Sequence, residues 1–165
     1  MDPVTIANEA TLIYDNITKN SNAVVTRILS LYDLTATKEA LLDSYTPGQT
    51  ITYITRVENT GSASLYNLTI VDDLANGTLQ YIDTSIEGYL NGSPIEVDVQ
   101  KTANTVTFKI DNVLNPNDNV LIIFETTTPT TNPEQITNTQ TITANGGSTT
   151  GPIVTAKPNP SATVT

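Results

Sequence analysis

The chain has 165 residues, 38% of them hydrophobic, and its 7 basic and 17 acidic residues give a formal net charge of −10. This length suits one domain with a core, and so acidic a chain, with no basic stripe, is not expected to bind nucleic acid or to insert into a membrane. Because cysteine and histidine are both missing, disulfides and Ser-His or Cys-His catalytic pairs are excluded.

The first thirty residues have strand character but are too few for a domain. The stretch TIANEATLIYD near the start matches QITNTQTITAN near the end, so that Ile6 and Asn8 align with Ile136 and Asn138 at a constant offset of 130. We interpret both stretches as closing strands of a repeat. Since a lone strand pair exposes unpaired backbone groups, we expect this arm to pair with its own sandwich or with another copy. The residues assigned to the assembly arm are Ile6, Asn8, Ala10, Leu12, Tyr14, Val24, Val25 and Ile28.

The middle of the chain, residues 31–146, is rich in strand signals. TITYITRVEN and NTVTFKID alternate with a period of two, and NVLIIFETT is a continuous apolar run typical of a central strand. Pro-Gly, Asn-Gly and Asn-Pro turns separate these runs. The pattern predicts an all-β, immunoglobulin-like antiparallel sandwich. The stretch TKEALLDSY is interpreted as the irregular end of a first strand. Residues 147–165, with three prolines, are expected to form an extended tail that is either a linker or a strand awaiting a partner.

An ordered set of motifs runs through roughly residues 35–145. In chain order they are Lys38, Pro47-Gly48, Tyr53 on an alternating strand, Asn59-Thr60-Gly61, Asp72, the turn and strand NPNDNVLIIFETT, and the closing strand ITNTQTIT. This set resembles the bacterial conserved-repeat surface domain catalogued as "domain of unknown function eleven". The resemblance implies an immunoglobulin-like sandwich of Gram-positive surface, adhesive or spore-appendage proteins, without catalytic activity. The chain departs from the pattern at Ala75, where proline is usual.

The resemblance also implies a candidate isopeptide crosslink. In related sandwiches of Gram-positive pili, a buried lysine attacks an asparagine carboxamide on a neighbouring strand, aided by a buried acid, and ammonia leaves. Here those positions would be Lys38, Asn138 and Asp72, and Asn8 offers a variant between copies. Burial would lower the lysine pKa and raise that of the acid. The alternative is a solvated Lys38, a strand-edge Asn138 and a turn-forming Asp72.

No catalytic residue, cofactor or metal site is expected from the remaining motifs. The acidic stretches VDDLANG and DNVLNPNDN lack the spacing of a calcium loop and are interpreted as turns. We therefore expect a structural subunit on an extracellular cell or spore surface, assembling head-to-tail with other copies of itself by strand complementation. One alternative is a passive spacer in a tandem-repeat protein. Another is an adhesive, glycan-binding or host-binding module, for which Tyr66, Tyr81 and Tyr89 are the only candidate platform.

Overall fold

The computed structural model describes residues 4–28, 31–131 and 135–165. They divide into two compact units, an N-terminal arm within Met1–Leu31 and a sandwich within Tyr32–Thr165. In the arm, the side chains of Ile6, Val25 and Ile28 lie outside the described residues.

The arm is an antiparallel hairpin built in two segments. Its strands are β1 (Val4–Asn8), β2 (Thr11–Tyr14), β3 (Ile17–Asn20) and β4 (Val24–Ile28). β1 pairs with β4, and β2 pairs with β3. Asp15 and Asn16 form the connecting turn with φ values of 48° and 61°, which suit a two-residue hairpin turn. The strands of the arm thus form the lone strand pair that its sequence suggested.

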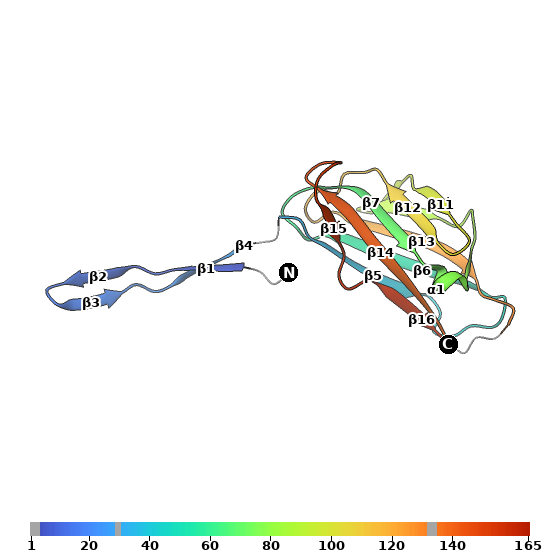
Figure 1. The fold of residues 1–165 in the computed structure, drawn as a ribbon, viewed down its shortest axis with the longest axis horizontal. Helices are drawn as coiled ribbons and strands as arrows, with labels where there is room; N and C mark the ends of the chain where they lie inside the picture. The colour runs from blue at the N-terminus through green and yellow to red at the C-terminus, as the bar shows by residue number, and fades with distance from the viewer. Residues whose placement is uncertain (1–3, 29–30, 132–134) are drawn as a thin grey trace. The chain divides into compact units, whose positions relative to one another are not determined.

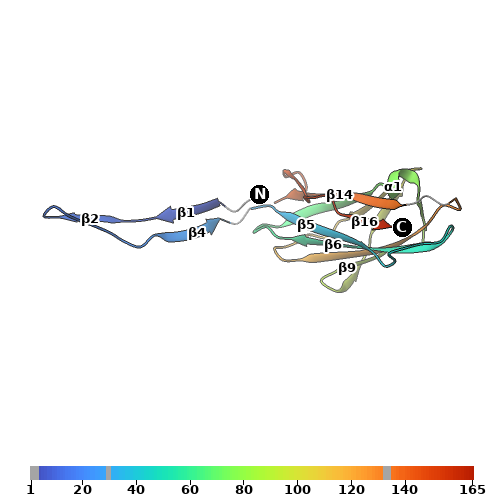
Figure 2. The same cartoon turned by 90° about the horizontal axis from the view of Figure 1, so that it is seen from below.

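The sandwich consists of two packed antiparallel sheets, seen edge-on in Figure 2. The first sheet has the strand order β10-β9-β13-β6-β5, and β8 also pairs with β13. Its strands are β5 (Leu34–Ala40), β6 (Thr50–Asn59), β8 (Gln80–Tyr81), β9 (Glu87–Leu90), β10 (Ser93–Ile95) and β13 (Asn119–Thr127). The stretch TKEALLDSY accordingly begins inside β5 and leaves it at Ala40.

The second sheet has the order β11-β12-β7-β14-β15, with β16 also pairing with β14 (Figure 1). Its strands are β7 (Leu65–Asp72), β11 (Asp98–Lys101), β12 (Val106–Ile110), β14 (Ile136–Gly146), β15 (Ile153–Thr155) and β16 (Ser161–Val164). A four-residue helical turn, α1 (Leu74–Gly77), follows β7. Ala75 has a φ of 52° there. Proline cannot adopt this value, which accounts for the departure from the family pattern at this position.

The core lies between the sheets and follows from period-two alternation. On β6, for example, Ile51, Tyr53, Thr55 and Val57 are buried while their neighbours are more exposed. Phe124 of β13 stacks on Tyr53 with ring centroids 5.5 Å apart. Aliphatic and aromatic side chains of both sheets fill the remaining space. The predicted all-β sandwich is confirmed.

The C-terminal segment 147–165 is neither a linker nor a separate tail, and the alternative of a strand with a partner agrees with the structure. Both β15 and β16 pair antiparallel with β14, and Ala162 and Val164 of β16 are buried in the core. Thr165 also exchanges backbone hydrogen bonds with Asp43 and Tyr45. The cause is the short alternation SATV, whose two apolar residues face inward despite the prolines before them. The segment is part of the sandwich.

Candidate crosslinking site

Lys38 and Asp72 form a buried ion pair between the two sheets. Lys38 points inward from β5, and Asp72 ends β7 in the opposite sheet. Lys38 Nζ lies 2.7 Å from Asp72 Oδ2, and both side chains are completely buried. Burial lowers the pKa of Lys38, and the charge and hydrogen bond of Asp72 oppose that shift without cancelling it. The structure therefore brings together two of the three residues predicted for the crosslink and rejects a solvated Lys38.

Aromatic rings surround the Lys38 ammonium group. Its Nζ lies 4.8 Å from the ring centroid of Tyr53 and 5.7 Å from that of Phe124, within the range of cation–π attraction. Burial, and after it the charge of Asp72, raises the pKa of the Tyr53 phenol. The amide of Asn138 lies close enough to oppose that rise but not in hydrogen-bonding geometry. Tyr53 thus lies next to both Lys38 and Asn138.

Asp72 is held by two further hydrogen bonds. Gln140 Nε2 donates to the same oxygen as Lys38, at 2.9 Å, and the Leu74 backbone N–H donates to the other oxygen at 2.9 Å. The Thr55 hydroxyl in turn donates to Gln140 Oε1 at 2.9 Å. A continuous polar chain therefore crosses the core from β6 through β14 and β7 to β5.

Sequence reasoning missed Gln140 and Thr55. Both face inward in the alternation of strands that were predicted, two residues from Asn138 and from Tyr53 respectively. That alternation was the available signal, because a polar residue at an inward position needs a partner.

Asn138 is completely buried on β14. Its Oδ1 accepts a hydrogen bond of 3.3 Å from the Ala75 backbone N–H. Among the described residues its Nδ2 has no hydrogen-bond partner. The side chain thus lies beside Tyr53, whose ring also contacts Lys38, and is hydrogen-bonded to neither Lys38 nor Asp72. A buried amide donor without a partner costs about 1–3 kcal/mol, so it calls for an explanation.

The arm residues predicted for assembly are exposed wherever their side chains are described. This set comprises Asn8, Ala10, Leu12, Tyr14 and Val24. Leu12 is 67% exposed and Tyr14 is 76% exposed, high values for large apolar side chains. They alternate along β2 and so lie on one face of the hairpin.

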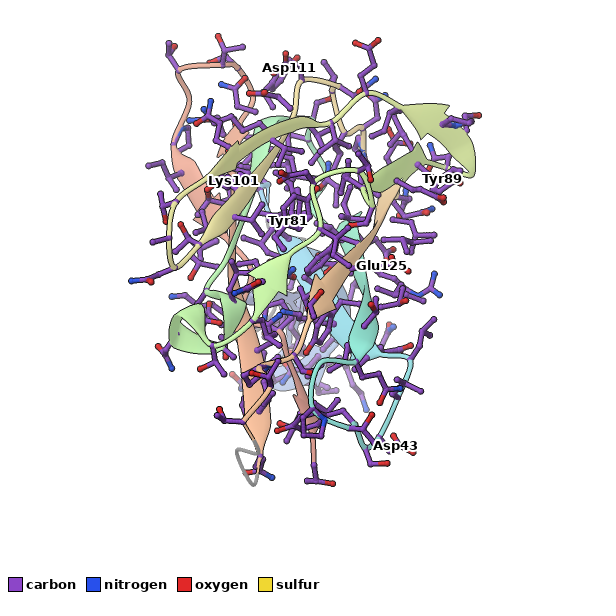
Figure 3. All side chains as sticks on the ribbon, turned by 90° about the vertical axis from the view of Figure 1, so that its right-hand side faces the viewer. Asp43, Tyr81, Tyr89, Lys101, Asp111 and Glu125 are labelled. Carbon is purple, nitrogen blue, oxygen red and sulfur yellow. The ribbon has the colours of Figure 1, made fainter. Side chains whose placement is uncertain are left out.

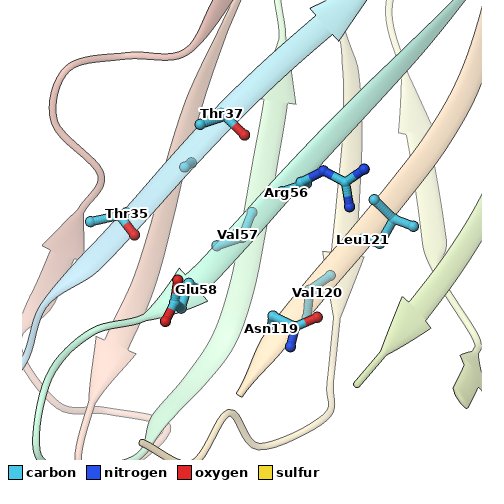
Figure 4. Close-up of a pocket in the computed structure, with 9 residues that line it drawn as sticks. Thr35, Thr37, Arg56, Val57, Glu58, Asn119, Val120 and Leu121 are labelled. Atoms are coloured by element: carbon cyan, nitrogen blue, oxygen red, sulfur yellow. The ribbon is translucent and has the colours of Figure 1, made fainter. Parts of the chain in front are cut away.

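The three tyrosines considered as a glycan platform do not meet. Tyr81 packs edge-on against Phe108 of the core, with centroids 5.8 Å apart. Tyr66 lies on β7 of the second sheet, whereas Tyr89 lies on β9 of the first, at the outside of the sandwich (Figure 3). A shallow groove of about 420 Å³ nevertheless crosses the outer face of β5, β6 and β13, lined by Arg56 and Leu121 among others (Figure 4). A second hollow joins these two residues to Tyr89.

Residues 4–28, 31–131 and 135–165 contain neither a membrane-spanning helix nor a cluster of metal ligands. No helix there is long and apolar enough to cross a bilayer. No group of three or more acidic side chains there is placed to hold a metal ion.

No family model and no curated protein matches the chain. Among solved structures, it is similar to a variant of BcpA, the major pilin subunit of Bacillus cereus, with a TM-score of 0.64 and 12% identity over 97% of this chain and 48% of the pilin. It is also similar to the major pilin SpaD of Corynebacterium diphtheriae, with a TM-score of 0.60 and 14% identity over 78% and 33% of the two chains. The collagen-binding subdomain of the Enterococcus faecalis surface protein ACE matches with a TM-score of 0.54 and 10% identity, over 83% and 99%.

These similarities establish an immunoglobulin-like sandwich. The chain spans about half the length of the Bacillus cereus pilin.

Proposed function

We propose that the chain is a structural module of an extracellular fibre, on a cell or spore surface, that is stiffened by an internal Lys38–Asn138 isopeptide bond and joined to neighbouring copies through its arm. The observation that carries this proposal is the completely buried Lys38, paired with Asp72 and packed on Tyr53, with the buried Asn138 beside that same ring. The fold shared with Gram-positive pilins, the resemblance to the conserved-repeat surface domain and the exposed arm support it.

The pocket supplies the groups that such a bond needs. The neutral Lys38 amine, favoured by desolvation, attacks Cγ of Asn138. The Ala75 backbone N–H, which is shared between Asp73 Oδ1 at 2.9 Å and Asn138 Oδ1 at 3.3 Å, would stabilise part of the negative charge that develops on Asn138 Oδ1. Asp72 takes a proton from the attacking nitrogen and passes one to Nδ2. The Cγ–Nδ2 bond then breaks, ammonia leaves, and an amide joins Lys38 to Asn138.

Intact mass spectrometry tests the bond. The folded chain is expected to weigh one ammonia less than its sequence mass, and Lys38→Arg and Asn138→Ala are both expected to have their full sequence masses. Asn112→Ala serves as control, since Asn112 is an exposed loop residue and its loss should leave the deficit in place. A wild-type chain at its unmodified mass would remove the isopeptide from the proposal.

Electron microscopy tests the role of the arm separately. Head-to-tail fibres are expected from the full chain and not from a chain that begins at Tyr32, because the exposed strands of the arm supply the contact. Fibres from both chains would show that the arm is dispensable. A full chain that remains monomeric at high concentration would favour the passive spacer.

The outer groove favours an adhesive module as the second candidate. Its Arg56, Leu121 and Tyr89 combine a cation, an apolar side chain and an aromatic ring, a mixture suited to an extended surface ligand. Since collagen-binding domains share the fold, collagen is the first ligand to try. Binding that is lost in Tyr89→Ala but retained in Tyr66→Ala would support this function.

A further inference from the structure

The arm repeats the architecture of the hairpin that closes the sandwich. We define the closing hairpin as β14 with its returning strands β15 and β16. In it, the first part of β14 pairs with β16, and the last part of β14 pairs with β15. The arm has the same arrangement, since β1 pairs with β4 and the following β2 pairs with β3.

The two hairpins also share the place where the returning strand is interrupted. In the closing hairpin, the backbone N–H of Gln140 crosses to the carbonyl of Pro160, which lies in the gap between β15 and β16. The aligned residue of the arm is Ala10, which lies between β1 and β2. Its backbone N–H bonds Ser21 Oγ at 2.9 Å and its carbonyl accepts from the Ser21 N–H at 2.8 Å, in the gap between β3 and β4. The correspondence therefore extends beyond the strand sequence to its pairing.

The sequence match falls on the inward face of the closing hairpin. In β14, Ile136, Asn138, Gln140 and Ile142 point into the core. The same offset of 130 gives Ile6, Asn8, Ala10 and Leu12 in the arm. At the next inward position, Tyr14 of the arm corresponds to the buried Ala144 of β14. A phenol ring would not fit there, so the correspondence between the two hairpins ends at Leu12.

We propose that the arm is a second closing hairpin, and that its docking site is the edge of β7 in another copy, where it takes the place of that copy's own closing hairpin before Lys38 and Asn138 of that copy are joined. This inference rests on the arm-mediated assembly proposed above and specifies its receptor. In the sandwich, β7 pairs with β14 in a register that sets Val71 opposite Thr141 and Ile70 opposite Ile142. The arm would present Thr11 and Leu12 at those places.

The exchange breaks and remakes contacts of the same kind, as in domain swapping, so its free-energy cost is the difference between the two hairpins. Two differences are visible in the registers. Thr26, which pairs with Ile6, would replace the buried Val164, which pairs with Ile136. The other difference is at Ala10. Gln140 donates to Asp72 and accepts from Thr55, and alanine would make neither bond. The closing hairpin also benefits from being attached to its own sandwich, so exchange is expected to grow with protein concentration. A docked arm would place Asn8 where Asn138 lies.

A reversible lock on the closing hairpin tests the proposal. The chain has no cysteine, so Val71→Cys with Thr141→Cys introduces a single disulfide between two residues that face each other on β7 and β14. Both oligomer tests use an Asn138→Ala background, because a Lys38–Asn138 bond would itself hold the closing hairpin in place. At high concentration, the reduced variant is expected to form arm-dependent oligomers and the oxidised one to remain monomeric. A chain beginning at Tyr32 should be monomeric in both states.

A gain-of-function variant provides the second measurement. Ala10→Gln is expected to raise the oligomeric fraction several-fold by restoring the bonds to Asp72 and Thr55, whereas the control Thr11→Gln, on the other face of the arm, should not. Arm-dependent oligomers that persist in the oxidised chain would overturn the docking site but keep strand complementation. An unlocked chain that never oligomerises would overturn both.

Discussion

Lys38 Nζ and Asp72 Oδ2 lie 2.7 Å apart across the core, with neither side chain in contact with solvent. Removing the cation alone leaves a buried carboxylate without its counter-charge. In an Asn138→Ala background, where the crosslink cannot form, Lys38→Met is therefore expected to lower the free energy of unfolding by about 3 kcal/mol or more in a urea titration. The control is Lys101→Met, which removes an exposed ion pair with Asp83 and should cost at most about 1 kcal/mol. Equal losses would contradict the role of burial.

The stability of the uncrosslinked chain should rise with pH because of Lys38. Its pKa in the folded state lies below the ordinary value of 10.5, so between those two values the unfolded chain holds more protons. We therefore compare the free energies of unfolding of Asn138→Ala and of Lys38→Met/Asn138→Ala. The first minus the second is expected to increase from pH 7 to pH 9.5. The upper limit avoids ionisation of Tyr53 in the unfolded state, which acts in the opposite direction because burial raises its folded-state pKa. A flat or falling difference would refute the lowered lysine pKa.

The same shift predicts the pH dependence of crosslinking. A larger fraction of Lys38 is neutral at higher pH, so the ammonia deficit should appear faster when refolding is started at pH 9 than at pH 6. Intact mass spectra at successive times measure the rate. A rate that does not change with pH would indicate that the amine is not the titrating nucleophile.

Gln140 depends on Thr55 for its carbonyl hydrogen bond. Thr55→Val keeps the shape of the side chain but leaves Gln140 Oε1 unpaired in the core, which is expected to cost about 1–3 kcal/mol. Thr50→Val, at an exposed position of the same strand, provides the control and should change stability little. If Gln140 also steadies Asp72 for proton transfer, Thr55→Val should slow the ammonia loss as well.

The burial of β16 predicts sharply different effects at adjacent residues. Val164→Asp places a carboxylate in the core and should destabilise the chain by several kcal/mol. Thr163→Asp adds the same charge at an exposed position and is expected to be nearly neutral. Thermal unfolding compares the two variants. Similar melting temperatures for the two variants would indicate that the C-terminal segment is not packed against the sandwich.

The sequence predicted those parts of the fold in which alternation is long. β6 was recognisable because it alternates over ten residues, and β13 because it contains the five-residue apolar run 120–124. β16 was missed because only Ala162 and Val164 signal it, directly after prolines that usually break strands. The arm was expected to be a strand pair, but its turn, Asp15-Asn16, was not located because it lacks the glycine that marks most such turns.

The candidate site was predictable only through an ordered motif. Lys38 and Asp72 were identified together from their places in the family resemblance, and the structure joins them. Gln140 could be assigned to the inward face of its strand, but its bond to Asp72 depends on how two sheets face each other. Alternation in the sequence predicts which side chains of a strand point into the core. It does not predict how far apart the side chains of two facing sheets lie.

Lys38 lies on the first strand of the sandwich, and Asn138 lies near the beginning of its last long strand. With a covalent bond between them, a pull applied to the two ends of the module would pass directly from one of these residues to the other. Residues 39–137 would then carry no tension, and the sheets they form could not be unravelled by stretching. Only the arm and the segment beyond Asn138 would remain extensible under load.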